Sequence, residues 1–292
     1  MAANTTYTFG LDVSKYQGTI NWDSLASQTK PSKASFVAIR GGISWAYKDP
    51  EFDRNWAESK RLNVPRMAYF VIYPNEDPMK QVDNWMKILG DDIGDLPPVI
   101  DVELHGGINV IHKCTPAKYQ ATLYNALAYL ETRSGVTPTS YTGSYFMDGY
   151  VIGGWPYPVP TWLNRYNWWL AQYLKIASEH PGPPRLCRGL DRSSVIIQQT
   201  SDKGVGFGVE SDTVDYNRWQ DETAKYKLQD LLISSIPDPV EPPVEPPVTP
   251  NPEPNYVKMK EIEYDGLMKR IGETDANGEE LHRFAKNIEV IK

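Results

Sequence analysis

The sequence predicts an α/β protein whose strands close into a parallel barrel. Strand-like and helix-like runs alternate up to about position 138, and strand-like runs then continue while helical signals become rare. Alternating β and α units followed by β-rich sequence indicate a barrel whose later repeats have lost helices. Four acidic residues, described below, are expected at the carboxyl ends of strands, where the active sites of such barrels lie.

Eight segments have the character of strands. Each is short, is rich in β-branched and aromatic residues, and is bounded by turn-forming residues. In chain order, we expect strands over residues 8–13, 35–41, 67–73, 99–103, 139–142, 168–173, 195–200 and 213–217.

Three helices are predicted in the first half of the chain. The clearest begins at the capping residue Asp77 with Pro78 at its first position, and it ends at Gly90. Its apolar residues recur at helical spacing, namely Val82, Trp85, Met86 and Leu89. A second helix is expected between Thr115-Pro116 and Gly135, and a third around residues 51–58.

Composition excludes several classes of protein. The chain has 292 residues, which suits one α/β barrel, and its formal charge is −7 without a basic cluster that would favour nucleic acid. No run of 18 apolar residues is present, so we expect no membrane partner. The two cysteines, Cys114 and Cys187, are expected to be reduced thiols, and neither a metal nor another cofactor is expected.

A proline-rich segment divides the chain. Nine of the 18 residues 237–254 are proline, and such a sequence forms an extended, semi-rigid spacer. We therefore predict a catalytic barrel over residues 1–235, a linker over 236–254 and a small C-terminal module over 255–292. Because 38 residues rarely form an independent core, the module is expected to bind a partner, to self-associate into a homo-oligomer, or to remain weakly ordered.

Two carboxylates end the fourth predicted strand. Asp101 and Glu103 are two residues apart, so both side chains lie on one face of the strand, with Cα atoms roughly 6.5–7 Å apart. Asp12 and Asp215 each follow an apolar, strand-like approach in the same way. Paired acids suit glycoside hydrolysis, which needs one protonated and one ionised carboxyl group. The alternative interpretation is a strand end with solvated acids.

Three ordered motifs resemble the family-25 glycoside hydrolases, the lysozymes (N-acetylmuramidases) common among bacteriophage endolysins. The chain carries D-x-S-x-x-Q-G-x-I-x-W over residues 12–22, P-P-x-x-D-x-E over 97–103 and V-D-x-N over 214–217. The resemblance spans about residues 8–219. It implies an irregular, flattened (β/α) barrel of the TIM type with fewer helices in its second half.

The acids are given separate roles. Glu103 is predicted to be the general acid, because it is longer than aspartate and nearby carboxylates raise its pKa. Asp101 is expected to stay ionised and to act either as a nucleophile or as the group that orients a substrate acetamido group. The resemblance favours the second role. Asp12 and Asp215 are predicted to hydrogen-bond the sugar or to tune Glu103.

Five other residues are predicted to bind substrate. Arg40, at the end of the second strand, is expected to balance the negative charge of the acids. Tyr69, Tyr141 and Tyr173 lie at strand ends, where aromatic rings can stack on sugar rings, and Gln172 is a polar neighbour. Core packing or a surface position is the alternative for each.

The resemblance implies a peptidoglycan hydrolase that cleaves the β-1,4 bond between N-acetylmuramic acid and N-acetylglucosamine with net retention, in the manner of a phage endolysin, and it makes the cell wall the expected partner of the C-terminal module. The alternatives are a chitinase-like hydrolase, a Mg²⁺-dependent barrel enzyme using the four acids as ligands, and a catalytically silent glycan-binding protein. Residues 1–6 lack the features of a signal peptide. The protein is therefore expected to stay in the host cytoplasm until it is released, through a holin pore, to the cell wall.

Overall fold

The computed structural model describes residues 8–27, 34–104, 114–154, 157–173, 182–205, 207–211, 213–233, 258–260 and 289–291. The chain divides into two compact units, Met1–Pro243 and Val244–Lys292. The second unit contains two short parallel strands, β10 (Lys258–Lys260) and β11 (Glu289–Ile291). The predicted linker, and the rest of the predicted C-terminal module, lie outside the described residues.

Eight strands of the first unit close into a barrel. Their order is β1-β9-β8-β7-β6-β5-β4-β2, and pairing of β1 with β2 closes the ring. All eight predicted strands are present, and the α/β barrel is confirmed. The strands are β1 (Phe9–Val13), β2 (Phe36–Ile43), β4 (Arg66–Val71), β5 (Val99–Val102), β6 (Thr139–Gly143), β7 (Asn167–Ala171), β8 (Val195–Gly204) and β9 (Val214–Trp219). A two-residue strand, β3 (Tyr47–Lys48), forms a hairpin with β2 and was not predicted.

One strand runs against the others. Strand β9 is antiparallel to both of its neighbours, β1 and β8, whereas the remaining barrel pairs are parallel. The expectation that all four acids lie at carboxyl ends of strands is therefore wrong for Asp215, which is the second residue of β9. Because β9 is reversed, its amino end lies at the same rim of the barrel as the carboxyl ends of the parallel strands.

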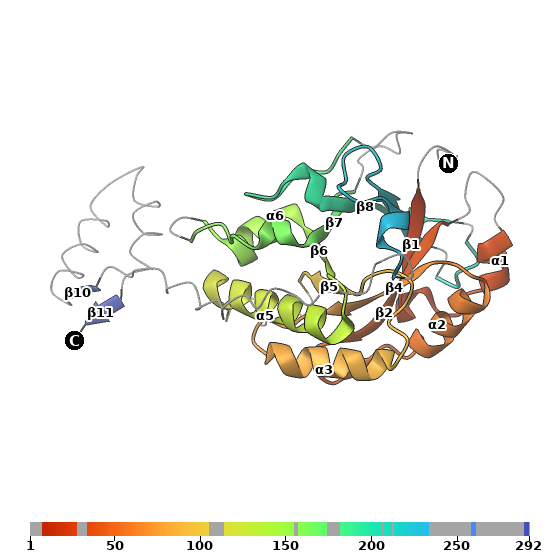
Figure 1. Cartoon of the computed structure of the whole chain (residues 1–292), viewed down its shortest axis with the longest axis horizontal. Helices are drawn as coiled ribbons and strands as arrows, with labels where there is room; N and C mark the ends of the chain where they lie inside the picture. The colour runs from red at the N-terminus through yellow and green to blue at the C-terminus, as the bar shows by residue number, and fades with distance from the viewer. Residues whose placement is uncertain are drawn as a thin grey trace. The chain divides into compact units, whose positions relative to one another are not determined.

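Helices cover the outside of the first half of the barrel. The three predicted helices are present as α2 (Phe52–Arg61), α3 (Pro78–Leu89) and α5 (Pro116–Ser134), and α3 and α5 lie side by side (Figure 1). Helix α3 has the expected ends: the Asp77 side chain accepts hydrogen bonds from the backbone N–H groups of Met79 and Lys80, and Gly90 terminates the helix.

Shorter helical segments complete this unit: α1 (Trp22–Ser27), α6 (Ser144–Phe146), the 3-10 turns η1 (Lys15–Gln17), η3 (Leu163–Arg165), η4 (Arg192–Ser194) and η5 (Leu228–Leu231), and the π-helical segment η2 (Met147–Ile152). Among the described residues after α5, no helical segment exceeds the six residues of η2. The predicted loss of helices in the second half is confirmed.

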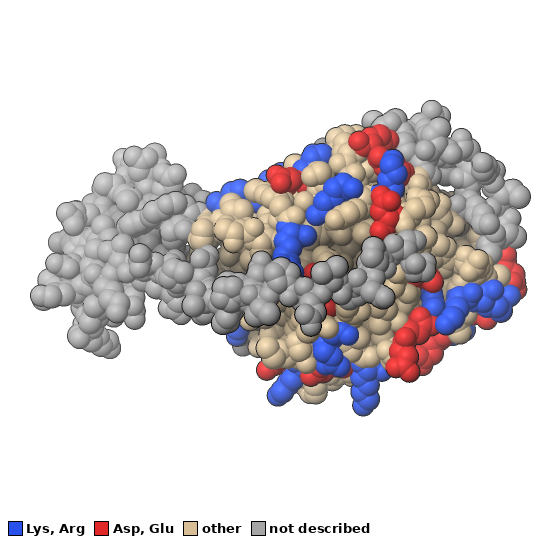
Figure 2. All heavy atoms as spheres, in the orientation of Figure 1, with Lys and Arg blue, Asp and Glu red and all other residues tan. Residues whose placement is uncertain are grey.

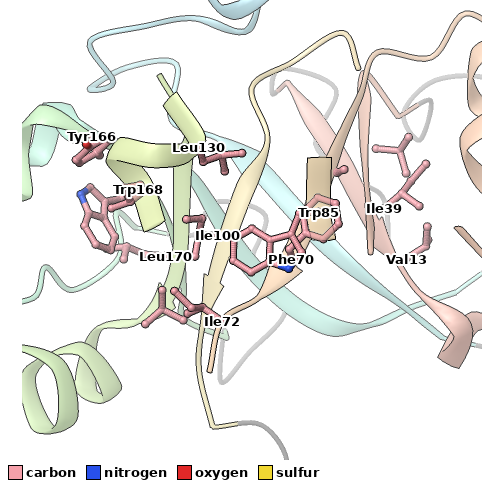
Figure 3. Close-up of a cluster of buried hydrophobic side chains, with 14 of the residues drawn as sticks. Val13, Ile39, Phe70, Ile72, Trp85, Ile100, Leu130, Tyr166, Trp168 and Leu170 are labelled. Atoms are coloured by element: carbon pink, nitrogen blue, oxygen red, sulfur yellow. The ribbon is translucent and has the colours of Figure 1, made fainter. Parts of the chain in front are cut away.

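The larger apolar cluster lies between the outer face of the strands and the helices. Phe70 of β4 stacks on Trp85 of α3 with ring centroids 5.4 Å apart, and Ile100 and Leu130 lie in the same layer (Figure 3). These side chains are fully buried. The outward-facing residues of the strands therefore hold the helices in place and leave the inward-facing residues to fill the barrel.

Along β2 and β5, the inward-facing side chains change from apolar to polar. On β2, Phe36 and Ala38 belong to a second buried cluster inside the barrel, and the next inward position is Arg40. On β5, Val99 lies in that cluster and Asp101 follows two residues later. Side chains two apart share a face of a strand. One end of the barrel is therefore packed with apolar side chains, and polar side chains gather at the other end.

Charged residues of both signs are mixed on the surface. Figure 2 shows Lys and Arg side chains interspersed with Asp and Glu on the face in view. Arg61, for example, contacts both Asp23 and Glu58. Among the described residues, no helix combines the length and apolar character needed to cross a lipid bilayer.

Candidate active site

A cavity of about 240 Å³ opens at the polar end of the barrel. Eight of the nine predicted site residues line it, and we call it the acid cavity. The lining residues are Asp12, Ser14, Tyr16, Gln17, Arg40, Tyr69, Asp101, Glu103, Tyr141, Trp169, Tyr173, Gln199 and Asp215.

Strand β5 brings Asp101 and Glu103 into the acid cavity. Asp101 is the third residue of the strand and is 4% exposed, and Glu103 follows the last residue of the strand. Burial, followed by the negative charge of Asp12, raises the pKa of Glu103 to about 7, although the positive charge of Arg40 opposes this shift. Glu103 therefore holds a proton in a substantial fraction of molecules near neutral pH.

Asp101 differs from the expectation that it stays ionised. Burial raises its pKa well above the usual value, and the charges of Glu103 and Asp12 add to this effect. Its Oδ1 atom is buried and has no hydrogen-bond partner among the described residues. Since hydrogen bonds to a carboxylate favour its charged form, the lack of a partner at this oxygen acts in the same direction as burial.

Asp12 and Asp215 form a carboxyl pair on two neighbouring strands of the barrel. They are direct register partners on β1 and β9, and a hydrogen bond joins their side chains. Burial, together with the charge of Asp12, raises the pKa of Asp215 to about 9. Like charges directly opposite each other on two strands repel, and the pair avoids this repulsion by sharing a proton.

Replacing Asp215 by asparagine is expected to stabilise the protein at pH 8 by about 1–2 kcal/mol. Asparagine cannot add a second negative charge, and its amide can still donate to Asp12. In the wild type the folded pKa, about 9, exceeds the ordinary value of 3.8. Wild-type stability therefore falls as pH rises through this window, and the advantage of the variant grows.

Thermal unfolding at pH 4 and pH 8 checks this prediction. The variant should gain several degrees in Tm at pH 8 and much less at pH 4. The matched control is Asp53→Asn on the exposed surface of α2, for which we expect little change at either pH. An equal gain for Asp215→Asn at both pH values would contradict the shared-proton interpretation.

Arg40 supplies the positive charge of the acid cavity. A register shift in β2 between Arg40 and Gly42 bends the strand after Arg40. The chain then returns through β3 to Asp49, whose Oδ2 lies 2.7 Å from Arg40 Nε in a buried ion pair. Burial by itself lowers the pKa of Arg40, but Tyr69 and Asp49 together raise it by more. The net pKa is above the usual value, so the guanidinium stays charged.

Aromatic rings form one side of the acid cavity. Tyr141 and Tyr69 both contact Trp169 edge to face, with ring centroids 4.9 Å and 6.5 Å away. Tyr16 and Tyr173 lie at the rim and are 65% and 48% exposed. The three predicted tyrosines thus reach the cavity, and the exposed ring of Tyr173 is able to stack on a sugar.

Gln172 lies beside the acid cavity rather than in it. With Tyr145 and Tyr173 it lines a second, adjoining cavity of about 320 Å³. Its side-chain oxygen accepts a hydrogen bond of 2.6 Å from the backbone N–H of Arg185. Tyr173 belongs to both cavities and so connects them.

Some residues of the acid cavity were not predicted from the sequence. Ser14 and Gln17 stand in the D-x-S-x-x-Q motif, but neither they nor Tyr16 were assigned to the site. Gln199 was missed although a buried glutamine that follows an apolar run, Val195–Ile197, needs a polar partner. Trp169 was missed because its apolar character is equally typical of the core.

An acid cavity at the open end of a closed barrel, with one carboxyl group titrating near pH 7, is the arrangement of a glycoside hydrolase. Comparison with known proteins supports the assignment to the glycoside hydrolases. The profile of the glycosyl hydrolases family 25 matches residues 11–205. The chain belongs to this family.

Individual relatives have low sequence identity to the chain. Protein YegX of Escherichia coli is 27% identical over 179 residues, which is 61% of each chain. Lysozyme M1 of Streptomyces globisporus is 26% identical over 192 residues, 57% of this chain and 61% of that one. The match thus spans about three fifths of the length of these curated relatives. In structure, the chain resembles a bacterial lysozyme from Streptomyces coelicolor with a TM-score of 0.65 and 22% identity, covering 80% of this chain and 100% of that one.

Proposed function

We propose that the protein is a peptidoglycan N-acetylmuramidase. It hydrolyses the β-1,4 bond between N-acetylmuramic acid and N-acetylglucosamine with net retention of anomeric configuration. Membership of glycosyl hydrolases family 25 and the likeness to Lysozyme M1 support this substrate. The observation that carries the proposal is the pairing of Asp101 with Glu103, whose pKa is raised to about 7, at the open end of the barrel.

Glu103 acts as the general acid. Breaking a glycosidic bond places positive charge on the sugar ring, and the leaving oxygen needs a proton as this charge develops. A carboxyl group with a pKa near 7 retains that proton at neutral pH and is still acidic enough to donate it. After bond cleavage the same group, now a carboxylate, accepts a proton from the incoming water.

Asp101 faces the reactive side of the sugar in either of two roles. As a carboxylate it attacks the anomeric carbon directly, or it accepts a hydrogen bond from the substrate's acetamido N–H while the acetamido oxygen attacks. The P-P-x-x-D-x-E motif over residues 97–103 supports the second role through its resemblance to family-25 enzymes. Both routes retain the anomeric configuration.

The other predicted residues bind the glycan or adjust the charge of the acid cavity. Asp12 and Asp215 form the floor of the acid cavity, and Arg40 limits the negative charge there. Tyr69, Tyr141 and Tyr173 contact the glycan, and Gln172 binds it in the adjoining cavity.

Mass spectrometry of digested cell walls tests the proposed bond. Purified walls should yield fragments whose new reducing end is N-acetylmuramic acid, whereas reducing N-acetylglucosamine would contradict the assignment. Chitin is the control substrate: sugar release from chitin but not from walls would favour the chitinase-like alternative. Binding to walls without any new reducing ends would favour the silent glycan-binding alternative.

In the Mg²⁺-dependent alternative, the four acids are metal ligands. In the structure, Asp12 Oδ2 already accepts hydrogen bonds from two side-chain amides, those of Gln199 and Asn217. The proposed mechanism therefore expects full activity after exhaustive treatment with EDTA. Loss of activity that Mg²⁺ restores would support the metal-dependent alternative instead.

Truncation tests the proposed domain boundaries. A chain ending at Ile236 is expected to fold and to cleave soluble glycan fragments at a rate close to that of the full chain. The last described residues of this shorter chain still pack on the barrel. Leu228 and Leu231 join the interior cluster, and the backbone N–H of Ile233 donates to the backbone oxygen of Asp95. Circular dichroism and a reducing-sugar assay measure the two properties.

A chain ending at Ala224 is the matched control and should fail to fold, because it lacks Leu228 and Leu231. Failure of the longer truncation to fold would contradict the boundary at residue 235. Light scattering on the full and truncated chains tests the homo-oligomer: the full chain should be larger than a monomer and the truncated chain monomeric.

We further propose that the protein is a phage endolysin. In this role it accumulates in the host cytoplasm, reaches the wall through a holin pore and lyses the cell. The motifs at residues 12–22, 97–103 and 214–217 support this reading through their resemblance to endolysins. Expression in a bacterial host with and without a holin tests it, since lysis should require the holin.

A further inference from the structure

A chain of side-chain hydrogen bonds crosses the floor of the acid cavity. Tyr141 O–H donates to Gln199 Oε1 at 2.8 Å, and Gln199 Nε2 donates to Asp12 Oδ2 at 2.9 Å. Asn217 Nδ2 donates to the same oxygen at 2.7 Å. Tyr141, Gln199 and Asn217 come from β6, β8 and β9, so the bonds connect segments that lie far apart in the sequence.

The hydrogen bond from Tyr141 sets the orientation of the Gln199 amide. A phenol O–H donates to the amide oxygen, and the amide N–H group must then point toward Asp12. Gln199 is 3% exposed, so water offers little alternative to this arrangement. Asp12 Oδ2 thus receives two N–H donors, which stabilise a carboxylate but not a carboxylic acid O–H at that oxygen.

The hydrogen bond from Gln199 affects which acid of the Asp12–Asp215 pair is ionised. Asp12 and Asp215 are hydrogen-bonded to each other, and sharing one proton leaves one of them negative. We propose that Gln199 is a positioning residue whose amide keeps Asp12, rather than Asp215, as the ionised member of the pair, and so keeps a negative charge beside Glu103. This inference rests on the proposed role of Glu103 as the general acid.

The charge on Asp12 matters because of where it lies. After burial, it is the largest cause that raises the pKa of Glu103. Several other titratable or charged groups interact with Asp12, with Glu103 or with one another from the surrounding strands and loops, namely Arg40, Tyr69, Asp101, Tyr141, Tyr173, Asp202 and Asp215. Of these, Asp215 shares a proton directly with Asp12, and Gln199 acts on this pair.

The test is the variant Gln199→Met, which removes the amide and keeps a side chain of similar length. Asp12 then loses one donor and gains proton affinity, and the negative charge moves toward Asp215. We expect the pKa of Glu103 to fall by about half a unit to one unit. The high-pH limb of kcat/KM on soluble peptidoglycan fragments should move down by the same amount, because the acid loses its proton earlier.

The neighbouring glutamine provides a matched control. Gln198 is also buried, but it lies on the opposite face of β8 and donates to the backbone oxygen of Gln172 at 3.2 Å. Gln198→Met loses a buried amide of the same kind from the same strand. Any loss of stability should be similar in the two variants, whereas the pH profile should move only in Gln199→Met.

A second measurement separates this inference from the proposed function. The carboxyl carbon of Glu103 is titrated by NMR, with its signal identified by its loss in Glu103→Gln. A lower pKa in Gln199→Met than in wild type and Gln198→Met would support the inference even if no wall substrate were cleaved. An unchanged titration of Glu103 in folded Gln199→Met would overturn it.

If Gln199→Met does not fold, Tyr141→Phe takes its place. This variant removes only the O–H group that orients the Gln199 amide, and the pKa of Glu103 should move in the same direction by a smaller amount. An unchanged titration in Tyr141→Phe would then overturn the inference.

Discussion

Replacing Glu103 by glutamine is expected to lower the rate of glycan hydrolysis by about 10²–10⁴-fold, the usual contribution of a general acid. Glutamine has nearly the same shape as the protonated acid but cannot donate a proton of comparable acidity to the leaving oxygen. The barrel should fold normally and bind glycan fragments as tightly as the wild type. Turbidity loss of purified walls measures the rate, and calorimetry with soluble fragments measures binding.

The matched control is Glu58→Gln. Glu58 lies on α2, pairs with Arg61 at 2.7 Å and does not line the acid cavity. This variant should clear walls at the wild-type rate. A Glu103→Gln protein that clears walls at that rate as well would remove Glu103 as the acid, and with it the proposed mechanism.

Replacing Asp101 by asparagine is expected to lower the rate by about 10²–10³-fold, as loss of a group that stabilises transition-state charge commonly does. Asparagine cannot attack the anomeric carbon, and it carries no charge to stabilise an acetamido group that attacks in its place. The remaining product should still retain its anomeric configuration. NMR of the freshly formed reducing sugar, recorded before mutarotation, identifies the first anomer released.

An inverted anomer as the first product of the wild-type enzyme would replace both roles of Asp101 with direct attack by water. The control is Asp83→Asn on α3, where the side chain pairs with Arg133 on the protein surface. We expect that variant to match the wild type in rate and in product. Equal rates for the two variants would show that Asp101 has no part in the chemistry.

Local patterns were enough to predict most of the barrel. Short strand-like runs located all eight strands, and the Asp77 cap, Pro78 and Gly90 located helix α3 with both ends correct. The two-residue period of a strand placed Asp101 and Glu103 on the same side of the chain at the end of β5. These features depend on residues close together in the chain, so they can be predicted without knowing how the barrel closes.

Long-range arrangement had to come from the structure. Nothing in the residues around Asp215 shows that β9 runs antiparallel, because strand direction depends on which neighbours the strand meets when the barrel closes. That reversal sets Asp215 opposite Asp12. Likewise, Gln199 meets Asp12 across 187 positions of sequence, and no local periodicity relates them.

The charge states also depend on the tertiary structure. The prediction that Asp101 stays ionised was made from its role facing the sugar, whereas closure of the barrel buries it among other carboxyl groups and raises its pKa. A pKa responds to desolvation and to charges brought close in space. The sequence therefore singled out the four acids that line the acid cavity, and the folded barrel decided which of them hold protons, because only folding sets their burial and their neighbours.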